Sequence, residues 1–169
     1  MAANRETIAV FPGTFDPVTL GHTDLIRRAS RLFTRIVIGV GHNPEKSAMF
    51  SPRERVEMIR ELVREIENAS VESYDGLTME FVRQVGGNVI LRGIRDGSDL
   101  RDELQFANAN LIVGDVETVF LMTSEQYALT SSTLIKQIVE LGGVNTERLR
   151  NLVPPSVLER LLDKIGRPR

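Results

Sequence analysis

A hydroxyl and an imidazole near the start of the chain have the types and spacing that phosphate binding requires. The apolar run 8–11 ends at Pro12-Gly13, which predicts a buried strand that passes into a tight turn with Thr14 beside it. Gly21-His22 then opens a segment with apolar residues at helical spacing, which predicts a helix with His22 in or beside its first turn. Because the N–H groups of a first helical turn lack intrahelical partners, these features predict a cradle for phosphate oxygens. The alternative is that His22 is a surface or capping residue, which is the commoner case for a lone histidine.

Three cationic side chains follow other apolar runs and could bind phosphate. Lys46 lies in a turn-rich segment, where an exposed lysine is usual, but this segment comes directly after a predicted strand. Arg92 directly follows an apolar run, so we expect its stem to be enclosed and its planar fork to face a phosphate. Arg95 could reach a second phosphate or form a salt bridge with Asp96 or Asp99.

Hydroxyl groups and one carboxylate complete the set of candidates. Ser131-Ser132-Thr133 opens an apolar helical pattern, so its hydroxyls could cap that helix or bind phosphate, and the two roles are compatible at one helix end. Glu103 lies one helical turn beyond Asp99, so it could order the arginines or contact a ligand.

Five strand-like runs alternate with helical patterns and must position these residues. The pattern predicts one Rossmann-like α/β domain over residues 1–169: a doubly wound, five-stranded parallel sheet with helices on both faces and a C-terminal helix. Ligands bind such sheets beyond the carboxyl ends of the strands. Because each candidate follows a strand, we expect the candidates to share one site. The predicted strands are 8–11, 36–40, 70–74, 89–91 and 118–122, and the predicted helices begin near residues 22, 52, 77, 99, 131 and 156.

Composition excludes several classes of protein. The 169 residues contain no cysteine and two histidines, which excludes a disulfide framework and makes a multi-histidine zinc site implausible. A net charge of −2 argues against sequence-independent nucleic-acid binding. No apolar run approaches the roughly 20 residues that span a bilayer, so we expect a cytoplasmic protein without a membrane partner. Neither G-x-G-x-x-G, G-x-x-x-x-G-K-[ST] nor G-x-S-x-G occurs, which disfavours dehydrogenases, P-loop enzymes and serine hydrolases.

The sequence resembles the HIGH-type nucleotidylyltransferases and, within them, the phosphopantetheine adenylyltransferase family. Pro-Gly-Thr-Phe-Asp-Pro at 12–17 followed by Gly21-His22 is similar to the superfamily signature. The blocks that match the narrower family are, in order, 43–46 with Met49-Phe50, Arg92-Gly93-Ile94-Arg95 and Ser131-Ser132-Thr133.

The resemblance implies transfer of the adenylyl group of ATP to 4′-phosphopantetheine, which gives dephospho-coenzyme A and pyrophosphate in coenzyme A biosynthesis. It implies that His22 stabilises the transition state, that Mg²⁺ bridges phosphate oxygens without an all-protein metal site, and that the chain forms a homo-oligomer, a hexamer. By the same resemblance the phosphopantetheine site contains Thr14, Lys46, Thr78 and Arg92. The ATP site contains Thr14, Phe15, His22, Gly93, Ile94, Arg95, Glu103, Tyr127, Ala128, Leu129, Thr130, Ser131, Ser132 and Thr133.

Two departures from the family pattern bear on these assignments. Family members usually have Asp-Phe-Glu-Tyr-Glu where this chain has Asp99-Leu100-Arg101-Asp102-Glu103, so packing near that turn can differ. Tyr127 is present, but Ala128-Leu129-Thr130 lacks the second aromatic of the family, so adenine contacts can differ. Two alternatives remain: a sister nucleotidylyltransferase with another phosphorylated acceptor, and a nucleotide-binding regulator without turnover.

Overall fold

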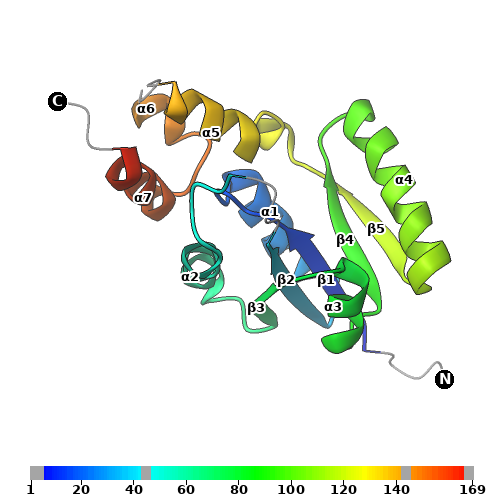
Figure 1. The fold of residues 1–169 in the computed structure, drawn as a ribbon. Coiled ribbons are helices and arrows are strands. Elements are labelled where there is room, and N and C mark those ends of the chain that lie inside the picture. Colours follow the sequence, from blue (N-terminus) through cyan, green and yellow to red (C-terminus); the bar gives the residue numbers. More distant parts are fainter. Residues whose placement is uncertain (1–5, 43–46, 142–145, 166–169) are drawn as a thin grey trace.

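Five parallel strands form one sheet in the spatial order β3-β2-β1-β4-β5 (Figure 1). The structure is a computed structural model that describes residues 6–42, 47–141 and 146–165. The strands are β1 (Ile8–Gly13), β2 (Arg35–Gly41), β3 (Ala69–Tyr74), β4 (Val89–Ile94) and β5 (Glu117–Met122). The helices are α1 (Leu20–Ala29), α2 (Pro52–Val63), α3 (Thr78–Gln84), α4 (Gly97–Gly114), the short 3₁₀ helix η1 (Glu125–Tyr127), α5 (Ser132–Glu140), α6 (Thr146–Leu149) and α7 (Pro155–Ile165).

The chain reverses its direction of travel across the sheet at β1. From β1 the chain adds β2 and β3 on one side, then crosses back and adds β4 and β5 on the other. The neighbours β1 and β4 pair in parallel through Ala9 with Val89 and Val10 with Ile90. This topology confirms the predicted doubly wound sheet, and it places the switch point, where such folds bind ligands, between β1 and β4.

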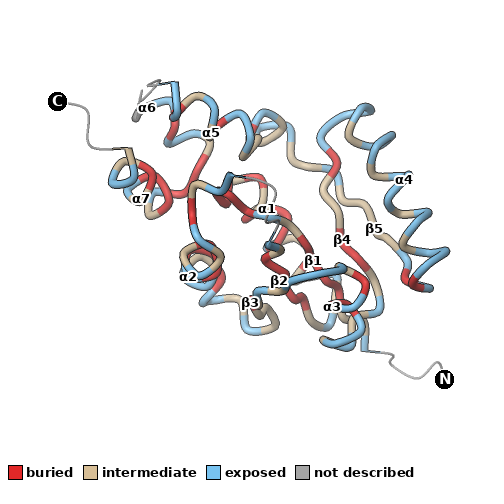
Figure 2. The backbone as a smooth tube through the Cα atoms, viewed as in Figure 1, coloured by how far each residue is buried: buried red, intermediate tan, exposed pale blue. Residues whose placement is uncertain are grey.

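Each face of the sheet has its own apolar cluster, because successive strand residues point to opposite faces. Ile36, Ile38 and Val40 of β2 belong to the larger cluster, which contains buried side chains of α1, α2, α5 and α7. Val37 of β2 belongs to the smaller cluster, with Val10 of β1 and buried side chains of α3. In Figure 2 the buried backbone is concentrated in the central strands and the helix faces turned towards them.

The start of α2 is a capping box, for which Ser51-Pro52-Arg53-Glu54 has the sequence signature. Ser51 Oγ accepts the backbone N–H of Glu54 at 3.2 Å, and Glu54 Oε2 accepts the N–H of Ser51 at 2.8 Å. Lys164 of α7 also contacts Glu54 at 2.9 Å, so the cap joins the C-terminal helix to α2. The helix α1 ends earlier than its apolar spacing indicates, at Ala29, and Leu32 lies beyond it with 63% of its surface exposed.

The helix α4 differs most from the sequence-based expectation. Its apolar stripe predicts a core-facing helix, yet Leu100, Leu104 and Leu111 are each more than a third exposed, and Gly114 is its one buried residue. In Figure 1 α4 lies beside β4 and β5 at the edge of the molecule. Other apolar side chains of this helix are more exposed still, with Ile112 at 84%.

No described helix is long and apolar enough to cross a membrane.

Candidate active site

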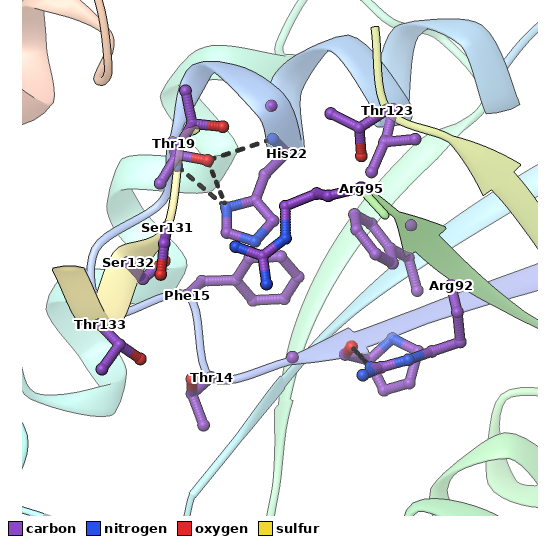
Figure 3. Close-up of a pocket in the computed structure, with 17 residues that line it drawn as sticks. Thr14, Phe15, Thr19, His22, Arg92, Arg95, Thr123, Ser131, Ser132 and Thr133 are labelled. Carbon is purple, nitrogen blue, oxygen red and sulfur yellow. Dashed lines mark hydrogen bonds between the residues drawn. The ribbon is translucent and has the colours of Figure 1, made fainter. Parts of the chain in front are cut away.

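A cavity of about 280 Å³ lies at the carboxyl ends of β1 and β4, at the switch point (Figure 3). Its wall comes from the turn after β1, the start of α1, the end of β4 and the segment before α5. The cavity therefore brings together residues that are far apart in the sequence. They are Phe11, Pro12, Gly13, Thr14, Phe15, Thr19, Gly21, His22, Leu25, Arg92, Gly93, Arg95, Thr123, Thr130, Ser131, Ser132 and Thr133.

His22 is the third residue of α1 and completes a capping box with Thr19. Thr19 Oγ1 accepts the N–H of His22 at 3.3 Å, and the N–H of Thr19 donates to Nδ1 of His22 at 3.0 Å. A backbone N–H can only donate, so Nδ1 must be the unprotonated nitrogen of the ring. In the neutral imidazole the proton is then on Nε2, which leaves an N–H donor for a ligand. The capping and the functional interpretations of His22 are therefore compatible in one geometry.

The environment of His22 keeps the ring neutral. Loss of contact with water, together with the positive charges of Arg95 and Arg92, lowers the pKa of His22 to about 4. The Phe15 ring meets the imidazole edge-on, with the ring centroids 5.0 Å apart. Near pH 7 the cavity therefore contains a neutral histidine donor beside two permanent cations.

The turn after β1 has a special backbone, since Phe15 has a φ of 50° and Asp16-Pro17 is a cis peptide. The conformation of Phe15 is uncommon for a residue with a bulky side chain. This turn brings the Phe15 ring under Gly13, where an added Cβ would lie 2.9 Å from the ring. Gly21 permits a second close approach, because a Cβ there would overlap the Thr130 hydroxyl.

Both arginines at the end of β4 are paired with carboxylates of α4. Arg95 Nε and Nη2 donate to the two carboxylate oxygens of Asp99 at 2.7 and 2.9 Å, which is the salt bridge considered from the sequence. Arg92 contacts Glu103 through Nε and Nη2, and its Nη1 donates to the carbonyl of Pro12 at 2.9 Å. The hydrogen bonds with Asp99 raise the pKa of Arg95, and those with Arg95 lower the pKa of Asp99. These pairs hold each guanidinium plane at the cavity wall.

The segment before α5 contributes hydroxyl groups to the opposite wall. Ser131 is the N-cap of α5, with Oγ accepting the N–H of Leu134 at 3.3 Å. The Ser132 hydroxyl donates to the carbonyl of Pro17 at 2.7 Å, which ties α5 to the turn after β1. Thr130 to Thr133 line the cavity. The predicted ATP-site residues Tyr127, Ala128, Leu129 and Ile94 are not among its lining residues, and Ile94 is buried while Leu129 is 80% exposed.

A second cavity of about 170 Å³ adjoins the first and shares Pro12 and Arg92 with it. Thr78 and Glu103 line this second cavity, and the Thr78 hydroxyl lies 2.9 Å from the Tyr74 hydroxyl. Glu103, predicted for the ATP site, thus lies on the side where Thr78 was predicted for phosphopantetheine. Lys46 lies outside the described residues.

Several residues around the cavity were not singled out from the sequence. Thr19 and Thr123 line the cavity, and their types and spacing carried no separate signal. Asp16 and Arg55 are buried next to it, with 7% and 2% exposure. Arg55 precedes Met58 and Ile59 at helical spacing, so its place on the apolar face of α2 was the available signal.

Comparison with known proteins agrees with this geometry. The cytidylyltransferase-like family model matches residues 10–138. The phosphopantetheine adenylyltransferase of Azoarcus sp. (strain BH72) is 45% identical over 166 residues, 98% of this chain and 99% of the relative. The enzyme of the same name from Acidovorax sp. (strain JS42) is 47% identical over 161 residues, 95% of each chain.

Solved structures support the fold alone, because their sequence identity is low. A crystal structure from Vibrio parahaemolyticus, provisionally named nicotinate-nucleotide adenylyltransferase, matches with a TM-score of 0.63 and 20% identity over 94% of this chain and 99% of the other. With near-complete coverage and more than 40% identity to both relatives, the chain belongs to the phosphopantetheine adenylyltransferase family of cytidylyltransferase-like proteins.

Proposed function

We propose that this chain transfers the adenylyl group of ATP to the phosphate of 4′-phosphopantetheine, with dephospho-coenzyme A and pyrophosphate as products. Full-length similarity to phosphopantetheine adenylyltransferases carries the proposal. The cavity supports it, because Thr14, His22, Arg92 and Arg95 meet where the fold binds ligands.

The reaction brings two polyanions together, and the cavity has the donors for that task. The acceptor phosphate oxygen forms a bond to the α-phosphorus of ATP as the bond to the leaving pyrophosphate breaks. Negative charge then grows on the leaving group, and fixed donors aimed at it lower the barrier. The Nε2–H of His22 and the guanidinium of Arg95 are such donors, and alignment of the two reactants lowers the barrier further.

We assign the two sides of the site from the family resemblance, and the two adjoining cavities support the division. The ATP phosphates lie against Thr14, the start of α1 with His22, and the hydroxyls of 130–133. The acceptor enters from the second cavity, past Thr78, so its phosphate meets Arg92 at the boundary between the two cavities. A guanidinium has five N–H donors, and the described bonds of Arg92 to Glu103 and Pro12 use three of them. Arg92 can therefore bind phosphate while Glu103 holds its plane.

Mg²⁺ fits this site as a companion of the ATP phosphates. The lining residues of the cavity include hydroxyls and cations but no carboxylate, and the described residues form no cluster of three metal-binding side chains. Phosphate oxygens and water, which Mg²⁺ prefers to retain, would therefore form most of its coordination shell. The ion would neutralise charge on the leaving pyrophosphate.

We also propose that the chain forms a homo-oligomer, and a hexamer by family resemblance. Exposed apolar side chains of α4, among them Phe106, Ile112 and Val113, each at least 65% exposed, are the surface that we expect to lie in an interface. We expect light scattering at micromolar concentration to give a mass several times that of one chain, and Ile112→Asp to reduce it. A wild-type monomer would contradict the proposal.

The substrate assignment is tested by pyrophosphate release from ATP with a panel of phosphorylated acceptors. We expect rapid release with 4′-phosphopantetheine and at least roughly 10²-fold slower release with nicotinate mononucleotide or glycerol phosphate, because a site built for one acceptor leaves polar groups unpaired with another. Fast turnover with another acceptor would favour a sister nucleotidylyltransferase. Binding of ATP without turnover on any acceptor would favour a regulator.

Replacement of His22 tests its role as a donor. We expect His22→Ala to lower kcat by roughly 10² to 10³, the usual cost of removing one transition-state donor, with a smaller change in substrate binding. The same change removes the acceptor of the Thr19 N–H and should cost about 1 kcal/mol of stability, the size of one hydrogen bond. Glu54→Ala is the control for the cap, because it removes the same position of the α2 capping box away from the cavity, together with the contact to Lys164. Equal kcat values for folded His22→Ala and wild type would exclude His22 from the mechanism.

The pH dependence separates a donor from a base. His22, with a pKa of about 4, stays neutral down to mildly acidic pH, whereas the second ionisation of a phosphate monoester lies near ~6. Activity should therefore fall below pH ~6 as the attacking phosphate becomes protonated, and His22→Ala should keep the same acid limb at its lower rate. Turnover at low acceptor concentration between pH 5 and 9, with ATP and Mg²⁺ saturating, measures both profiles. If the limb disappears in His22→Ala, the histidine acts as the base.

A further inference from the structure

Three charged residues outside the main cavity lie against the turn that carries Thr14, two of them buried and one, Lys136, partly exposed. Asp16 belongs to this turn, Arg55 to α2 and Lys136 to α5. They line a small cavity of about 80 Å³ that shares Thr14 with the main cavity. Arg55 is only 2% exposed, and no step described above uses it.

The Arg55 guanidinium joins three separate stretches of backbone. Its Nη1 donates to the carbonyl of Thr14 at 2.6 Å and to that of Gly41, at the end of β2, at 3.1 Å. Its Nε donates to the carbonyl of Phe50 at 3.1 Å, just before α2 begins. One side chain therefore fixes the turn after β1 relative to β2 and α2.

Asp16 and Lys136 complete the same network, Asp16 as an acceptor of hydrogen bonds and Lys136 as a second cationic donor. The carboxylate of Asp16 accepts the N–H groups of Met49 and Phe50, each at 2.9 Å. The ammonium of Lys136 lies 3.4 Å from Asp16 and donates to the carbonyl of Ser47 at 2.9 Å. The segment from Ser47 to Phe50 is thus held from both sides, and its Phe50 carbonyl in turn holds Arg55.

Stability alone gives a weak reason for this arrangement. Burial lowers the pKa of the Arg55 guanidinium, which reflects the cost of keeping a charge away from water, while Asp16 acts in the opposite direction. Apolar side chains of similar size often replace buried charges without loss of stability. A fixed position for the Thr14 turn is a second reason, because a small misplacement of a binding group can lower a rate substantially.

We propose that Arg55 is a positioning residue for adenylyl transfer and that it acts through Thr14. The guanidinium holds the Thr14 carbonyl, and so sets where the Thr14 hydroxyl and N–H meet the phosphates relative to His22. The kinetic part of this inference rests on the proposed function. The inference also requires that Arg55 affects ATP binding through Thr14.

A double-mutant cycle between Arg55 and Thr14 tests the proposal. We expect Arg55→Lys to lower kcat/KM and ATP affinity about tenfold each, the size of one lost hydrogen bond to a charged group. In a Thr14→Ala background Arg55→Lys should lower kcat/KM and ATP affinity by no more than about twofold each. The two losses are not additive, because Arg55 acts through Thr14. Steady-state kinetics and calorimetric titration with ATP give the two readouts. Arg55→Gln, which buries no charge, provides a second cycle with the same expectation.

Arg60 is the matched control on the same helix. Its Nη2 donates to the carbonyl of Val71 in the edge strand β3 at 3.0 Å, so it also holds backbone, but away from the cavity. We expect Arg60→Lys to lower thermal stability while leaving kcat/KM and ATP affinity within twofold of wild type. Equal losses from Arg55→Lys in the two Thr14 backgrounds would overturn the proposal, as would an equal kinetic loss from Arg60→Lys. Wild-type turnover on the acceptor panel tests the proposed function, and the ATP-affinity cycle tests this inference, so each can fail separately.

Discussion

The reversal of the chain at β1 is the constraint on which the site depends. Crossover connections between parallel strands are right-handed, so with β2 and β3 on one side of β1 and β4 and β5 on the other, the connecting helices cover opposite faces of the sheet. The segments that leave β1 and β4 therefore diverge, and a crevice opens between them. The residues after β1, with Thr14, and at the end of β4, with Arg92, face that crevice because of topology, and local sequence then decides what they do there.

Electrostatics in the crevice combine a neutral donor with permanent cations. His22 stays neutral because its ring is largely shielded from water and because the arginines at the end of β4 disfavour a third positive charge. Those arginines are themselves held by Asp99 and Glu103 of α4. Anionic ligands would thus meet guanidinium groups whose planes are already fixed, so little side-chain entropy remains to be lost on binding.

Local signals were sufficient to predict much of the fold. The capping box at Ser51 and the apolar run before Pro12 depend on neighbours in the sequence, and the structure agrees with both. The alternation of strands and helices was enough to predict a parallel sheet, because the right-handedness of crossover connections leaves few possible topologies. The cavity likewise unites Thr14, His22, Arg92 and Arg95, as expected from their place after strands.

Features set by distant contacts could not be predicted in the same way. The partners of Arg55 are carbonyl groups, which every residue has, so no residue type marks them in the sequence. The apolar stripe of α4 has the same spacing as a core-facing stripe, and one sequence cannot separate a surface that packs inside the chain from one that packs against another chain. Boundary differences, such as the end of α1 at Ala29, arise because capping geometry overrides hydrophobic spacing.

The cavity wall also determines when the binding site can form during synthesis of the chain. Its parts come from residues near 14, 92 and 132, so a chain emerging from the ribosome cannot complete the pocket until the residues up to Thr133 have been made. A nucleotide can recognise only the finished arrangement, and it therefore stabilises the whole sheet against unfolding and not one half of it. Cellular ATP would in this way stabilise completely folded molecules against proteases and would leave partly folded ones unprotected.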